Sequence, residues 1–182
     1  MKRLLGLLVG LVAVAGVIGL AYGGSQDTIN IKVTLATDIN VNITEAEFNF
    51  GVLPGGETSV HGTGATVTNT STSNREDYQL NLANPGVWTA ITTGTPGDDE
   101  YMLMAQFSDS TPSSWASADH ALDVGAVDCS VAKFGNGTYG ECGLDVPLSA
   151  PTRYLWFRIT MPLSSAEVNE RTIPVTVTAS VG

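Results

Sequence analysis

After residue 24 the sequence alternates repeatedly between apolar and polar side chains, and a period of two residues is typical of β-strands. The first such segment has Ile29, Ile31, Val33 and Leu35 on one face. The same alternation recurs at residues 39–43, 65–69, 78–82, 154–161 and 173–181. No convincing helical stripe of apolar residues follows residue 24. The sequence therefore predicts an all-β chain.

Further short strands are expected at residues 48–51 and 87–91. Residues 101–107 form a near-continuous apolar run, which is typical of a strand buried on both faces. A short helix near residues 114–122 is the one helical element expected in this part of the chain. About eight to ten strands, separated by Gly, Pro and Asn turns, predict an antiparallel β-sandwich of the Ig-like or jelly-roll type.

The first residues have the layout of a secretory signal peptide, which would form a helix. Lys2 and Arg3 precede the apolar run 4–20, and Ala21-Tyr22-Gly23 is a small-x-small cleavage pattern. We expect residues 1–23 to be a signal peptide and residues 24–182 to be a single domain. The run is also long enough for an uncleaved membrane anchor. The protein is expected to be secreted, extracellular or at the cell surface, with membrane contact only through the leader.

Charge argues against nucleic acid as a partner. Charged residues make up 14% of the chain, and 18 acidic residues stand against eight basic ones. Removal of Lys2 and Arg3 leaves six basic residues, so the net charge of the mature chain is about −12. Such a surface repels phosphate backbones.

Two cysteines, Cys129 and Cys142, lie in the predicted mature part. Export and an even count favour one structural disulfide between them. Residues 130–134 and 138–142 flank an Asn-Gly pair, which predicts a hairpin that the disulfide would pin. The alternative is a metal or redox pair, but the spacing is too wide for a redox Cys-x-x-Cys.

No catalytic motif is recognisable, and we expect the protein not to be an enzyme. The two histidines, His61 and His120, lie in no known motif, and no nucleophile elbow, zinc-protease helix or phosphate-binding loop occurs. No cofactor is expected. Two weaker ligand candidates remain.

The first is calcium, for which Asp98, Asp99 and Glu100 supply oxygen ligands in one loop, although the patterned calcium loop is missing. The second is a carbohydrate or other ligand stacked on Trp115, which lies in a polar loop and is expected to be exposed.

The two most regular strands lie at the two ends of the predicted mature chain. An end strand with one apolar face can complete its own sheet, or it can lie in a groove of another subunit. Repeated head to tail, the second contact builds a filament. Residues 28–36 are the candidate donor strand, and Ile29, Ile31, Val33 and Leu35 would insert. The alternative is that both terminal strands pair inside one sandwich.

Three short motifs carry a family resemblance. Residues 48–56 form a strand and turn with Phe-Gly followed by Pro-Gly, residues 67–70 begin with Val-x-Asn, and residues 78–80 read Tyr-Gln-Leu. With the leader and the N-terminal strand, this layout resembles exported Ig-like sandwiches, namely bacterial matrix-fibre and camelysin-like proteins and archaeal pilins that join by donor strands. The resemblance covers residues 25–82 and implies a sandwich that polymerises outside the cell. Camelysin-like proteins have been described as metalloproteases, but no zinc motif here supports that activity.

The sequence thus favours a structural subunit of an extracellular filament, pilus or surface layer, with other copies of itself as partners. The alternative is a monomeric binding module, secreted or at the cell surface, for a carbohydrate or a protein.

Overall fold

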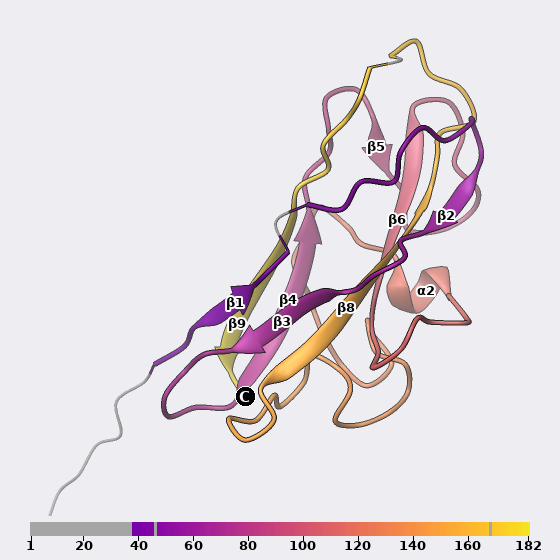
Figure 1. Ribbon diagram of the computed structural model, residues 1–182. Coiled ribbons are helices and arrows are strands. Elements are labelled where there is room, and N and C mark those ends of the chain that lie inside the picture. The colour runs from indigo at the N-terminus through magenta and orange to yellow at the C-terminus, as the bar shows by residue number, and fades with distance from the viewer. Residues whose placement is uncertain (1–37, 46, 168) are drawn as a thin grey trace, which may run out of the picture. The chain divides into compact units, whose positions relative to one another are not determined.

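The computed structural model describes residues 38–45, 47–167 and 169–182, which all belong to one compact unit, Leu35–Gly182. Two β-sheets pack face to face around an apolar core (Figure 1), so the predicted all-β sandwich is confirmed. Among the described residues, no helix is long and apolar enough to cross a membrane.

The larger sheet contains six strands. They are β1 (Val41–Ile43), β2 (Thr58–Val60), β3 (Ala65–Asn69), β5 (Thr89–Ala90), β6 (Glu100–Phe107) and β8 (Thr152–Thr160). Their order is β1-β3-β8-β6-β5, and β2 also pairs with β8. All pairs are antiparallel except β5 with β6. Strand β1 is therefore one edge of this sheet.

The smaller sheet has three strands in the order β7-β4-β9. They are β4 (Glu76–Leu82), β7 (Val127–Asp128) and β9 (Val175–Val181). The register of β4 and β9 runs without a break from Glu76↔Val181 to Leu82↔Val175. Strand β9 is thus paired along its whole length on one side only.

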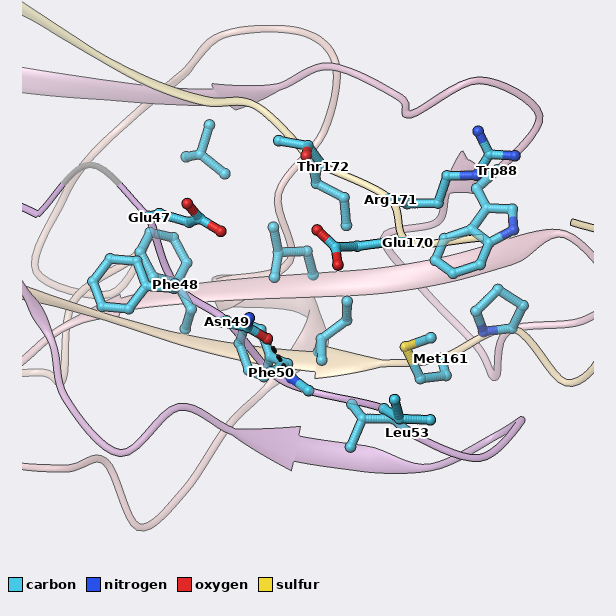
Figure 2. Close-up of a pocket in the computed structure, with 18 of the residues that line it drawn as sticks. Glu47, Phe48, Asn49, Phe50, Leu53, Trp88, Met161, Glu170, Arg171 and Thr172 are labelled. Atoms are coloured by element: carbon cyan, nitrogen blue, oxygen red, sulfur yellow. Dashed lines mark hydrogen bonds between the residues drawn. The ribbon is translucent and has the colours of Figure 1, made fainter. Parts of the chain in front are cut away.

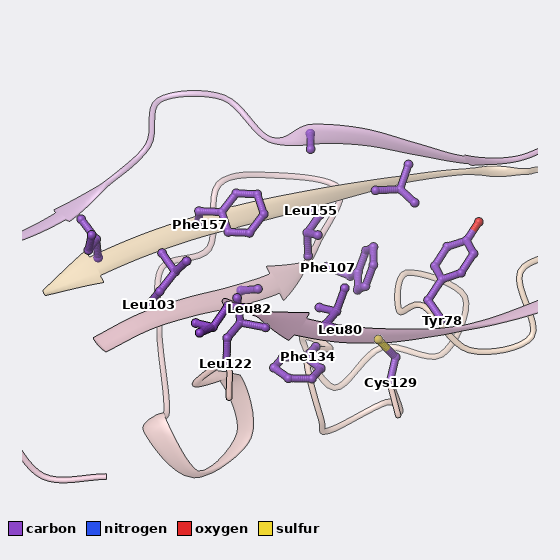
Figure 3. Close-up of a cluster of buried hydrophobic side chains, with 14 of the residues drawn as sticks. Tyr78, Leu80, Leu82, Leu103, Phe107, Leu122, Cys129, Phe134, Leu155 and Phe157 are labelled. Atoms are coloured by element: carbon purple, nitrogen blue, oxygen red, sulfur yellow. The ribbon is translucent and has the colours of Figure 1, made fainter. Parts of the chain in front are cut away.

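Alternate side chains of the long strands fill the space between the sheets (Figure 3). The fully or nearly fully buried ones are Val67 on β3, Tyr78, Leu80 and Leu82 on β4, Tyr101, Leu103 and Phe107 on β6, and Leu155, Phe157 and Ile159 on β8. These are the apolar faces that the period of two predicted. Burial of this apolar surface is the main stabilising contribution to the fold.

Strand β6 is buried on both faces, as predicted. Met102 and Met104 point away from the main core and pack with Ala121, just after the short helix α2 (Ser117–His120). The helix lies within the range where a short helix was expected. Residues 115–121 therefore cover part of the outer face of β6.

The chain enters the sandwich beside the loop that follows β3. Asp38 Oδ2 accepts hydrogen bonds from the N–H and the hydroxyl of Thr72 at 2.9 and 2.8 Å. Asn74 Nδ2 donates to the carbonyl of Asp38 at 3.1 Å. Thr72 and Asn74 follow Asn69, the last residue of β3. Asp38 is therefore fixed beside the end of β3 that is opposite to Ala65, its first residue.

Two predictions of extended structure are wrong. Residues 48–51 form no strand, because no neighbouring strand offers them a ladder, and Gly51 has a φ of +71°. Residues 130–142 form no hairpin, because Phe134, Gly137 and Gly140 have φ values of +57°, +85° and +94°, which interrupt extended backbone. The short strands β2 and β7 were not predicted.

Candidate functional site

A long apolar groove opens between the two sheets and has a volume of about 880 Å³ (Figure 2). Its floor is formed by core side chains of the larger sheet, namely Ala65, Leu103, Leu155, Phe157 and Ile159. One wall is residues 47–53, and the other is residues 169–173 with the start of β9. The groove therefore runs along the core of the sandwich on this side, although its floor residues are themselves largely buried.

The β9 wall has an unused hydrogen-bonding edge. Gly182 N–H donates to the Arg75 carbonyl, and Ala83 N–H donates to the Pro174 carbonyl, so the even-numbered residues of β9 are those bonded to β4. The backbone groups of Val175, Val177 and Ala179 consequently face away from β4. Among the described residues they have no backbone partner.

The side chains of these three residues point toward the core, but they are only partly covered by other residues. Val175, Val177 and Ala179 pack against the core and are only partly buried, whereas the corresponding residues of β4 are fully buried. A strand that has an apolar face and, at the edge of its sheet, unpaired N–H and C=O groups is a template for pairing with another chain.

The opposite wall, residues 47–53, is held by side chains instead of a ladder. Phe48 and Phe50 are half-buried, and the ring of Phe48 lies 4.7 Å from His61. Within the described residues, the one hydrogen bond made by the backbone of this segment joins Gly51 N–H to Asn49 Oδ1 at 2.7 Å. Backbone groups that lack ladder partners thus border the groove on both sides.

Polar groups close one end of the groove. Trp88 Nε1 donates to Ser165 Oγ at 3.0 Å, and Ser165 Oγ donates to Asp99 Oδ1 at 2.5 Å. Arg171 forms an ion pair with Glu167. These contacts fix the segment between β8 and β9 over the groove end.

The predicted donor residues Ile29, Ile31, Val33 and Leu35 lie outside the described residues. Trp115, predicted to be exposed, is half-buried against Met102 and Met104, and its ring lies 5.9 Å from that of His120. Trp115 is therefore less exposed than predicted, because the outer face of β6 is also apolar.

The three calcium candidates each accept a hydrogen bond from the protein. Ser164 Oγ donates to Asp98, Ser165 Oγ donates to Asp99, and Gly97 N–H donates to Glu100. Among the described residues, no three Asp, Glu, His or Cys side chains are grouped so as to hold a metal ion.

Cys129 and Cys142 are both free and buried in the structure, so the predicted disulfide is not formed there. The two cysteines do not lie on paired strands of a hairpin. Instead, the segments that carry them both bond to the backbone of Tyr78 on β4. Cys129 N–H donates to the Tyr78 carbonyl, and Tyr78 N–H donates to the Gly143 carbonyl. The Cys129 thiol nevertheless lies close to the segment that carries Cys142, since a Cβ at the next residue, Gly143, would lie 3.2 Å from Cys129 Sγ. Burial is the main cause that raises the pKa of the Cys129 thiol.

No family model matches the sequence, and no curated protein matches it significantly.

Sequence reasoning did not find the groove. The signal was present in part, because Phe48 and Phe50 alternate toward the core and β9 has a regular apolar face. What the sequence does not contain is which strands are edges, since that depends on the pairing order of strands far apart in the chain.

Proposed function

We propose that this chain is a structural subunit of an extracellular filament, pilus or surface layer, in which residues 28–36 of one copy lie in the groove of the next. The observation that carries the proposal is the groove itself. It runs along the apolar core between two segments whose backbone groups lack ladder partners among the described residues. An added strand would supply both the missing side chains and the missing hydrogen bonds.

Residues 28–36 suit this groove by their pattern and length. Ile29, Ile31, Val33 and Leu35 give one continuous apolar face, and their polar neighbours would face solvent. A strand rises about 3.3 Å per residue, so the seven residues 29–35 extend over about 20 Å. Four branched side chains would then lie over the apolar floor of the groove.

The position of Asp38 favours a second copy as the acceptor. Thr72 and Asn74 hold Asp38 beside the loop after β3, whereas the groove lies against Ala65 at the other end of that strand. Asp38, which follows the candidate donor strand in the sequence, is thus held at the end of the sandwich opposite Ala65. A donor at one end and an acceptor at the other make a head-to-tail contact that does not close, which produces a filament.

A monomeric binding module is the second candidate, because the groove volume of about 880 Å³ is within the usual range for small-molecule sites, about 300–1,000 Å³. Trp88 lies at the groove and supplies an aromatic side chain. We propose no catalytic role.

The test compares two double variants of the exported protein by negative-stain electron microscopy at rising concentration. Ile31→Asp/Val33→Asp places two charges on the apolar face of residues 28–36. Asn30→Gln/Thr34→Gln changes two residues of the polar face without adding charge and is the control.

We expect fibres from the wild type and from the control, and single particles with an unchanged melting temperature from the first variant. Normal fibres from Ile31→Asp/Val33→Asp would refute strand exchange through this segment. Single particles from the wild type at every concentration would favour the binding module.

A further inference from the structure

Two carboxylates on opposite sides of the groove lack partners among the described residues. Glu47 belongs to the wall formed by residues 47–53, and Glu170 belongs to the opposite wall. In Figure 2 the two carboxylates point toward each other. Both residues are exposed, and neither makes a hydrogen bond or an ion pair with any described residue.

Other acidic side chains near the groove are occupied. Glu45 accepts hydrogen bonds from the N–H and the hydroxyl of Thr66 at 2.5 and 3.1 Å. Glu167 is paired with Arg171. Arg171 is the one basic residue that lines the groove within the described part of the chain. The described residues at this site thus supply no cation for Glu47 and Glu170.

The proposed donor strand contains one charge. Lys32 is the only charged residue between Asp27 and Asp38. If Ile31 and Val33 face the floor of the groove, the side chain of Lys32 faces the mouth, because successive side chains of a strand point to opposite faces. Glu47 and Glu170 line the groove and are exposed, so their carboxylates lie at its mouth.

We propose that Lys32 of a second copy lies between Glu47 and Glu170 and fixes the register of the inserted strand. This inference rests on the strand exchange proposed above and adds the residues that select the register. A slip of one residue would turn the apolar face outward. A slip of two residues keeps the apolar face inward, so the hydrophobic pattern alone does not prevent it. It moves Lys32 by about 7 Å, away from the two carboxylates.

The ion pair also makes the concentration needed for assembly depend on the salt concentration. Exposed ion pairs are weak, so Lys32→Gln is expected to raise the concentration needed for assembly by roughly three- to tenfold. Lys32→Glu places a third negative charge between two others and is expected to have a larger effect. The difference from the wild type should shrink as salt screens the charges.

The experiment measures the critical concentration of assembly of the exported full chain by sedimentation. NaCl is varied from about 0.01 M to about 1 M, over which the Debye length falls from about 30 Å to about 3 Å. The variants are Lys32→Glu, Glu170→Lys and the charge swap that combines them. Lys133→Glu gives the same change of net charge away from the groove, where the Lys133 ammonium donates to the Ala118 carbonyl.

We expect Lys32→Glu to raise the critical concentration at least about tenfold at low salt, Lys133→Glu to change it little, and the charge swap to restore assembly. If Lys32→Glu behaves as Lys133→Glu does at every salt concentration, while both form fibres, the register role is wrong and strand exchange stands. If the wild type forms no fibres at any salt concentration, strand exchange fails and this inference fails with it.

Discussion

The ring of Phe48 lies 5.4 Å from the ring of Phe157 on β8, with the two planes inclined by 54°. This contact anchors the wall formed by residues 47–53 to the core, although that wall has no strand ladder. Aromatic packing of this kind contributes both buried area and a favourable ring–ring geometry. The wall is therefore a fixed border of the groove whose backbone groups remain available.

Replacement of Phe48 by Ala should lower the free energy of unfolding by about 2 kcal/mol, which is less than the roughly 3–5 kcal/mol typical of a fully buried Phe. Val52 in the same segment is 100% exposed, so Val52→Ala is the matched control and should change stability by less than about 0.5 kcal/mol. Urea unfolding of the non-assembling Ile31→Asp/Val33→Asp protein measures both values. Equal stabilities of the two Ala variants would show that the wall is not anchored through Phe48.

A subunit with a blocked groove should act as a chain terminator. Val177→Glu places a carboxylate on the β9 wall, while residues 28–36 remain intact and can still enter the groove of another copy. Mixing small amounts of this variant into wild-type protein should shorten the fibres, as measured by electron microscopy. Thr178→Glu on the exposed face of the same strand is the control. Fibres of equal length in the two mixtures would argue against β9 as the acceptor edge.

His120 should make folding stability fall below neutral pH. Its Nδ1 accepts the Ala116 N–H at 3.0 Å, and its Nε2 lies 3.0 Å from the Gly135 carbonyl, to which it donates, so the buried ring is neutral. Burial is the main cause that lowers its pKa from 6.5. The Lys133 charge also lowers it, and the Gly135 carbonyl and the Asp119 charge act in the opposite direction.

Because the folded pKa is lowered, the contribution of neutral His120 is complete above pH 6.5 and is lost as the pH falls from there toward the folded pKa. Each unit of pKa difference corresponds to about 1.4 kcal/mol. Melting temperatures measured between pH 8 and about pH 4.5 should therefore fall in the wild type and in His61→Gln, and fall less in His120→Gln. Identical slopes in all three proteins would contradict this role.

The cysteines should react slowly in the folded protein. Both are buried, and burial raises the pKa of the Cys129 thiol, so little thiolate is available. Under native conditions we expect slow reaction with a thiol reagent, and rapid reaction of both thiols after denaturation. Rapid native labelling would contradict the buried positions. A denatured, unreduced protein without free thiols would instead support the disulfide predicted from the sequence.

The sequence predicted the long elements well because their alternation is a local property. Strands β4, β8 and β9 lie where the period of two places them, and β6 lies where the near-continuous apolar run predicts a strand buried on both faces. Strands β2 and β7, of three and two residues, are too short to produce a pattern.

The candidate site was less predictable because it depends on contacts between distant residues. Phe48 and Phe50 do alternate toward the core, but no partner strand lies beside them, and their pattern alone could not reveal that. Trp115 stands in a polar stretch, yet Met102 and Met104 on the outer face of β6 half-bury it. The groove exists because β9 is an edge, which follows from the order of the whole sheet.

Amide hydrogen exchange along β9 tests the central claim most directly, with the Ile31→Asp/Val33→Asp protein as the unassembled reference. In that reference, the amides of Thr176, Thr178 and Ser180, which face β4, should be protected, and those of Val175, Val177 and Ala179 should exchange rapidly.

In wild-type fibres the second set should become protected as well, because an inserted strand accepts their hydrogen bonds. Fibres in which Val175, Val177 and Ala179 still exchange rapidly would contradict strand insertion at this edge.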